Sequence, residues 1–197
     1  MRALVCEAYG PPEDLILKDL DVPEVGPGQV RVSVKAAAIN FPDLLVIAGQ
    51  YQVKTPPPFV PGSEAAGVVD AVGEGVTQYS PGDEVIVVPT GGAFGEYCVA
   101  DQHFVMPKPQ GLDFVTAAGF TITYGTSYHA LADNAELKEG ETLLVLGAAG
   151  GVGIAAVEIA KSMGAKVIAA ASSEDKLEFA KRAGADEFIN YETAPLK

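Results

Sequence analysis

One short glycine-rich segment has the composition and spacing of an anion-binding loop. Residues 147–153 read GAAGGVG; against the dinucleotide pattern GxGxxG this is AxGxxG, with Ala148 in the place of the first glycine. Gly150 stands where the backbone must approach a pyrophosphate, and Gly153 where the helix packs on the strand. A helix that begins near Gly151 would point its free N–H groups and positive dipole end at the phosphates. The spacing predicts nucleotide binding, and a plain tight turn is the alternative.

The residues after the next expected strand, 166–170, should select between two dinucleotides. Ser172 and Ser173 can donate hydrogen bonds to a phosphate, and Lys176 lies about one helical turn further on. Glu174 and Asp175 are a complication, because an acid that binds the ribose hydroxyls of NAD is sought about 20 residues past the loop. If Ser172 caps the next helix, both carboxylates fall in its first turn, where the helix dipole favours them. We therefore expect NADPH rather than NADH.

A parallel α/β sheet would position these residues. Thr142–Leu146 is too apolar to alternate, so we expect a strand buried on both faces, which implies a parallel sheet. Two similar segments, 160–165 and 180–185, each read as a helix end with a left-handed glycine, followed by strands at 166–170 and 187–190. Strand, helix, strand, helix, strand is one mononucleotide-binding half of a doubly wound fold. A solenoid, which needs at least three copies, is the alternative.

The first half of the chain has a β-rich pattern instead. Val30, Val32 and Val34 alternate with polar residues, which predicts one half-buried strand. Further strands are expected at 66–72, 84–88, 95–100 and 104–106. Short strands with frequent turns predict a small barrel or curled sheet. A short helix is expected over Phe41–Ala48, and from Asp113, the expected N-cap, the period becomes helical.

Composition limits the function classes. The chain has 197 residues, 48% of them hydrophobic, and a net charge of −13, which repels phosphate backbones and anionic lipid, so no nucleic-acid partner is expected. Cys6 and Cys98 form no CxxC motif, so we expect neither a disulfide framework nor a zinc ribbon, and a reduced, cytoplasmic setting suits them. No signal peptide and no apolar run near the ~18 residues of a membrane span is present, so no membrane insertion is expected.

The stretch Gly140–Lys161, which contains the glycine loop, resembles the signature of the quinone oxidoreductase and zeta-crystallin branch of the medium-chain dehydrogenase/reductase superfamily. Glu158 departs from the pattern, which usually has Gln there; we expect it on the helix exterior. Residues 38–43, 61–67 and 81–83 agree with the same family in order. The resemblance covers essentially the whole chain.

This resemblance implies a fold and an activity. It implies a GroES-like barrel domain, residues 1–123, followed by the N-terminal half of a Rossmann NADPH-binding domain, residues 124–197, with nicotinamide between them. It also implies NADPH-dependent, zinc-free reduction of a quinone or another activated enone, a small-molecule substrate, and a homodimer when full length. Zinc-dependent relatives carry Cys where Asn40 stands and His where Ser63 stands, so no metal site is expected.

The resemblance also assigns individual residues. It places Asn40 and Thr126 beside the nicotinamide, as the catalytic residues. Cofactor contacts are expected from Asn40, Thr126, Gly150, Gly151, Val152, Gly153, Ser172, Ser173, Lys176 and Tyr191. As alternatives, Asn40 is only a helix N-cap and Thr126 only a buried helix hydroxyl bonded to its own backbone. Leu45 replaces a Tyr that some relatives place near the nicotinamide.

Other catalytic arrangements are not supported. Ser127, His129 and Asp133 share one expected helix on which they cannot form a triad, and hydride transfer to a quinone needs no strong protein base. Two function hypotheses follow: a quinone or enone reductase, and a non-catalytic NADPH-binding protein of the same fold that stores cofactor or binds a partner. Half of a sheet leaves an edge unpaired, so we expect a fragment of a longer protein, with completion by another chain as the alternative.

Overall fold

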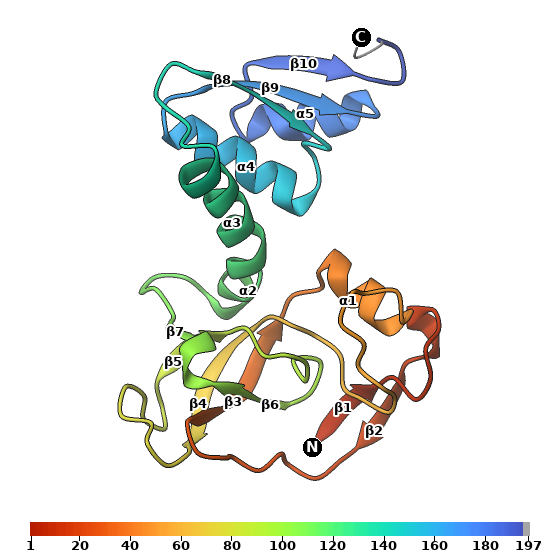
Figure 1. The fold of residues 1–197 in the computed structure, drawn as a ribbon, viewed down its shortest axis with the longest axis vertical. Helices are drawn as coiled ribbons and strands as arrows, with labels where there is room; N and C mark the ends of the chain where they lie inside the picture. Colours follow the sequence, from red (N-terminus) through yellow and green to blue (C-terminus); the bar gives the residue numbers. More distant parts are fainter. Residues whose placement is uncertain (195–197) are drawn as a thin grey trace. The chain divides into compact units, whose positions relative to one another are not determined.

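The computed structural model describes residues 1–194, and the chain divides into two compact units between Thr121 and Ile122 (Figure 1). The sequence placed the boundary two residues later. Among the described residues, no helix has the length and apolar character that crossing a membrane requires.

The first unit is built on a five-stranded antiparallel sheet with the order β6-β3-β4-β5-β7. Its strands are β3 (Gln29–Ala37), β4 (Ala65–Val72), β5 (Glu84–Val87), β6 (Tyr97–Asp101) and β7 (Val105–Pro107). All five were predicted to within two residues at each end. A separate antiparallel pair, β1 (Arg2–Val5) and β2 (Ile16–Asp19), was not predicted.

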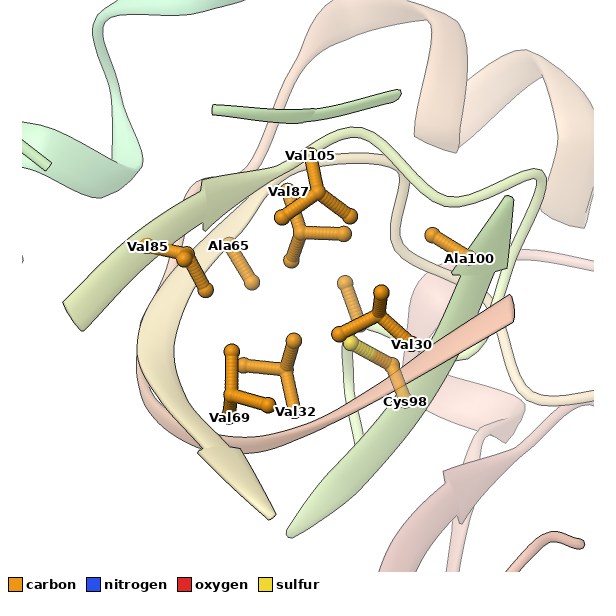
Figure 2. Close-up of a cluster of buried hydrophobic side chains, with 10 residues drawn as sticks. Val30, Val32, Ala65, Val69, Val85, Val87, Cys98, Ala100 and Val105 are labelled. Carbon is orange, nitrogen blue, oxygen red and sulfur yellow. The ribbon is translucent and has the colours of Figure 1, made fainter. Parts of the chain in front are cut away.

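The sheet curls around a core of small aliphatic side chains, as Figure 2 shows. Val30 and Val32 of β3 are fully buried, as the alternation predicts, and Val34 packs against the cluster at its edge. Cys98 lies in the same cluster, and burial raises the pKa of its thiol to about 12. This thiol is therefore a packing group and not a thiolate nucleophile.

Two short α-helices accompany this sheet. They are α1 (Phe41–Ile47), preceded by Asn40 as N-cap, and α2 (Phe114–Ala118). The carboxylate of Asp113 accepts a hydrogen bond from the backbone N–H of Thr116 at 2.7 Å, which confirms Asp113 as the cap of α2. Single 3₁₀ turns occur at Pro12–Asp14 and Gln102–Phe104.

The second unit contains a three-stranded parallel sheet with the order β10-β9-β8. The chain runs through α3 (Thr121–Tyr128), a π-helical segment (His129–Asn134), β8 (Thr142–Leu146), α4 (Gly151–Ser162), β9 (Lys166–Ala171), α5 (Glu174–Arg182) and β10 (Glu187–Asn190). Gly164 and Gly184, which follow α4 and α5, have φ values of 80° and 105°. The left-handed helix ends and the parallel sheet are thus confirmed.

The prediction that β8 is buried on both faces is wrong. Val145 is buried, but Leu144 and Leu146 are 48% and 62% exposed. The core of this unit joins Val145 to buried residues of α4 and α5, and two right-handed crossovers in the same direction place both helices on one face of the sheet. The alternate side chains of β8 therefore lie on the other face.

Candidate functional site

The glycine loop forms a tight turn at the carboxyl end of β8. Gly147 has a φ of 62°, a conformation that favours glycine, and its carbonyl accepts the N–H of Gly150 at 2.9 Å. Ala148, in the place of the first glycine of the pattern, is fully buried, and its N–H donates to the carbonyl of Ala170 in β9 at 3.1 Å. The loop is thereby held to both strands.

Gly153 and Gly150 lack side chains for different reasons. A Cβ added at Gly153 would lie 2.4 Å from the carbonyl oxygen of Gly147 and 2.9 Å from Cα of Ala148, so the chain itself needs this glycine. A Cβ at Gly150 would meet only the oxygen of Gly147, at 3.4 Å. The space beside Gly150 is therefore left open by the chain, as a close approach of a ligand to the backbone requires.

The N-terminus of α4 is suited to a negative group. Gly150 is its N-cap, no side chain caps the helix, and its first turn contains no acidic residue. The first N–H groups of a helix have no intrahelical partner, so those of Gly151, Val152 and Gly153 are directed outward at the positive end of the dipole. The hydroxyl of Ser127 donates to the carbonyl of Val152 at 2.8 Å, which ties α3 to this first turn.

The predicted cofactor-binding residues Ser172, Ser173, Lys176 and Tyr191 lie at the carboxyl edge of the sheet, as the glycine loop does, because they follow the parallel strands β9 and β10. Lys176 donates from Nζ to Oγ of Ser172 at 2.8 Å. Tyr191 follows β10, its N–H donates to the carbonyl of Ala171 at 3.2 Å, and its side chain is 38% exposed. The predicted cap is wrong by one residue: Ser173, not Ser172, is the N-cap of α5. The Ser172 hydroxyl is instead bound to the ammonium group of Lys176.

The acid that complicates the choice of dinucleotide is bound at the carboxyl end of β10, the strand next to β9. Glu174 lies in the first turn of α5, as predicted, together with Asp175. Its Oε1 accepts a hydrogen bond from Nδ2 of Asn190, the last residue of β10, at 2.8 Å. Asn190 was not among the predicted site residues.

In the first unit, Asn40 belongs to a buried polar cluster. The side chains of Asn40, Asp43 and Glu64 are buried. Nδ2 of Asn40 donates to Oε2 of Glu64 at 3.0 Å, and Oδ2 of Asp43 accepts the backbone N–H of Asn40 at 2.7 Å. Ser63 donates from Oγ to Oδ1 of Asp43 at 2.8 Å. Asn40 is thus an N-cap by position, and its amide nitrogen is also oriented by a buried carboxylate.

Thr126, the other predicted catalytic residue, lies on α3 in the second unit, and its side chain is exposed. The alternative of a buried helix hydroxyl is therefore wrong. The joint role of Asn40 and Thr126 at a nicotinamide stays a prediction, since the two residues belong to different units.

Comparison with known proteins agrees with this geometry. The family models for the alcohol dehydrogenase GroES-like domain and for zinc-binding dehydrogenases match residues 26–110 and 151–197. The chain is 42% identical over 199 residues to a quinone oxidoreductase-like protein 2 homolog of Nematostella vectensis, covering 100% of the chain and 54% of the relative. The chain belongs to the quinone oxidoreductase branch of the medium-chain dehydrogenase/reductase superfamily.

Further members of this branch show the same likeness. Human quinone oxidoreductase is 38% identical over 193 residues, covering 97% of the chain and 59% of that protein. A crystal structure of Escherichia coli quinone oxidoreductase complexed with NADPH superimposes with a TM-score of 0.93 at 32% identity, covering 100% of the chain and 60% of that protein. The chain thus spans little more than half the length of these relatives, and the predicted fold class is confirmed.

One departure from the family pattern has a local electrostatic effect. Glu158, where the pattern usually has Gln, is exposed on α4 and accepts a hydrogen bond from the hydroxyl of Tyr124 on α3. The pKa of Tyr124 is raised to about 12, mainly by this hydrogen bond and to a smaller extent by partial burial. The native state therefore holds the phenolic proton at a pH where an unfolded chain, with a Tyr pKa of about 10, has lost it.

A titration of tyrosine absorbance checks this effect. Up to about pH 11, the parent protein and Tyr124→Phe should develop the same phenolate signal, because Tyr124 is still protonated. Glu158→Gln, which restores the family residue, should lower the pKa of Tyr124 and add its signal in this range. The stabilisation of the native state by the raised pKa of Tyr124 is fully present below about pH 10 and is lost as the pH rises through about 12. An added signal in the parent itself would contradict the Tyr124–Glu158 interaction.

Three hydrogen-bonding residues of the site were not predicted from the sequence, namely Asp43, Glu64 and Asn190. Asp43 had a usable signal, since an acid three residues after an N-cap favours the reciprocal bond to the backbone that is seen here. Glu64 had none, because an isolated acid before an apolar run usually lies on the surface.

Proposed function

We propose that the protein is an NADPH-dependent oxidoreductase that reduces a quinone or another activated enone without zinc. The observation that carries the proposal is the N-terminus of α4, which no side chain caps and which lies beside the open space at Gly150, with the Lys176–Ser172 pair at the same edge of the sheet. The first feature suits a pyrophosphate and the second a 2′-phosphate. The NADPH complex of the Escherichia coli relative supports this choice of cofactor.

Bound NADPH would supply a hydride, and with one proton from solvent a quinone becomes a hydroquinone while NADPH becomes NADP⁺. In this chain, Gly151–Gly153 bind and orient the pyrophosphate through backbone N–H groups, and Lys176 with Ser172 binds the ribose phosphate. Asn40 and Thr126 are assigned to the nicotinamide. The chain mainly holds the cofactor and the quinone in a reactive orientation, which is what a hydride transfer between two reactive partners requires.

Zinc independence rests on the side chains at the two ligand positions of the zinc-dependent relatives. The amide of Asn40 and the hydroxyl of Ser63 are poor zinc ligands, and each is bound to a carboxylate, of Glu64 and Asp43 respectively. Among residues 1–194, no group of three or more His, Cys, Asp or Glu side chains could hold a metal ion.

The proposal is tested by steady-state oxidation of NADPH by the natural full-length protein with a panel of quinones and enones. Turnover that depends on the acceptor supports it. Tight binding of NADPH with no turnover for any acceptor would favour the non-catalytic alternative.

Lys176→Ala tests whether Lys176 binds the 2′-phosphate of NADPH. Loss of a charge-assisted hydrogen bond should weaken NADPH binding by roughly 10- to 150-fold and leave NADH binding nearly unchanged. The matched control is Lys181→Ala, which removes the same charge from the last turn of α5. There, Nζ of Lys181 lies 3.5 Å from Oε2 of Glu178. Equal losses for the two nucleotides, measured by titration of nicotinamide fluorescence, would contradict the assignment, as would a parent that prefers NADH.

A further inference from the structure

We infer that Asn190 is a positioning residue for cofactor choice: it holds the carboxylate of Glu174 at the end of β10, so that the carboxylate does not compete for the ribose. The inference rests on the proposed function, because it concerns the site for the adenosine ribose of a dinucleotide. The structure places this amide–carboxylate contact beside that site, at the carboxyl edge of the three-stranded sheet.

Within one helical turn, the chain has two residues of opposite charge that could bind the ribose end of a dinucleotide, Glu174 and Lys176. Glu174 follows the glycine loop by about 20 residues, the spacing at which an acid binds the ribose hydroxyls of NAD. Lys176, two residues later, suits the additional phosphate of NADP. A free carboxylate there would repel a 2′-phosphate, so a preference for NADPH requires that Glu174 be directed elsewhere.

The Asn190 side chain is oriented for this task from both ends. Its Oδ1 accepts the backbone N–H of Glu192 at 3.1 Å, so the amide presents its nitrogen to Glu174. Its backbone carbonyl accepts the N–H of Ala194 at 2.8 Å, which closes a turn directly after β10. An amide whose oxygen is already bound offers Glu174 only N–H donors, and these attract a carboxylate.

The opposite charges are directed to different strands. Glu174 contacts the end of β10 through Asn190, whereas Lys176 contacts Ser172, directly after β9. Residues two apart on a helix do not face each other, so α5 itself keeps the two groups apart. With the carboxylate bound to Asn190, the ammonium group and the Ser172 hydroxyl can bind a phosphate without competition from Glu174.

The experiment compares the dissociation constants of NADPH and NADH for the natural full-length protein and three variants. Asn190→Ala frees Glu174 and should lower the preference for NADPH over NADH by about 5- to 10-fold, the effect expected when a freed carboxylate repels a 2′-phosphate in a solvent-exposed site. Glu174→Gln in the Asn190→Ala background should restore the preference, because the freed group no longer carries charge. Thr193→Ala, which removes only a hydroxyl contact of 3.3 Å to the Asn190 carbonyl, is the matched control and should leave it unchanged.

The outcomes separate this inference from the proposed function. A parent that binds neither nucleotide overturns both. A parent that prefers NADPH, and keeps that preference in Asn190→Ala, overturns the inference alone. Loss of the preference that Glu174→Gln does not restore also overturns it, because Asn190 would then act through the turn at 190–194 and not through the carboxylate.

Discussion

Gly150→Val should abolish dinucleotide binding while the second unit stays folded. Gly150 has a φ of −77° and a ψ of 162°, a conformation that a β-branched residue adopts without strain, and the space around its missing Cβ is open. The Val side chain would instead occupy the space that a pyrophosphate needs at the N-terminus of α4. If two charge-assisted hydrogen bonds of about 1.5 to 3 kcal/mol each are lost, the dissociation constant rises by at least ~100-fold.

The measurement is a titration with NADPH alongside thermal unfolding of the same samples. Gly150→Ala, which adds only a Cβ 3.4 Å from the Gly147 oxygen, should fall between the parent and Gly150→Val in affinity. Unchanged affinity in Gly150→Val would remove the loop from the site. A collapse of the fold in this variant would contradict the open space assigned to Gly150.

Gly153→Ala should have the opposite character and destabilise the fold itself. The added Cβ would lie 2.4 Å from the oxygen of Gly147 and 2.9 and 3.0 Å from Cα and C of Ala148, which are backbone atoms and cannot rotate away. The steric cost outweighs the roughly 1 kcal/mol that Ala gains over Gly in a helix, and the free energy of unfolding should fall by at least about 2 kcal/mol.

Gly125→Ala is the matched control for this change. Gly125 also lies inside a helix, α3, but a Cβ there would meet nothing within 4 Å. The same substitution should therefore stabilise the protein, by up to about 1 kcal/mol. Chemical denaturation of both variants measures the two signs. A Gly153→Ala protein as stable as Gly125→Ala would contradict the close packing of α4 on the glycine loop.

Local patterns predicted much of this fold because each reflects one dominant physical cause. The alternation around Val32 reports a strand with one buried face, and Gly164 and Gly184 report left-handed helix ends. Whether β8 is buried on one face or on both could not be inferred in this way. An apolar run such as Leu144–Leu146 records what a strand can bury, not which helices cover it.

In the candidate site, too, the features set by local sequence spacing were predictable and those set by tertiary packing were not. The glycine loop and the residues after β9 were predictable because phosphate binding requires particular residues at fixed spacing. The contacts of Glu64 with Asn40 and of Asn190 with Glu174 join residues 24 and 16 positions apart. Such pairs depend on tertiary packing, and neither acid differs in sequence from an ordinary surface carboxylate. The exact cap of α5 was missed because two adjacent serines satisfy the same local rule.

The proposed function is tested by NADPH oxidation by the natural full-length protein after dialysis against a strong chelator, with metal analysis of the same sample. We expect no tightly held zinc, and NADPH consumption that requires a quinone and proceeds at the rate of the undialysed protein. One zinc per chain whose removal abolishes turnover, or no quinone-dependent oxidation of NADPH at all, would contradict it.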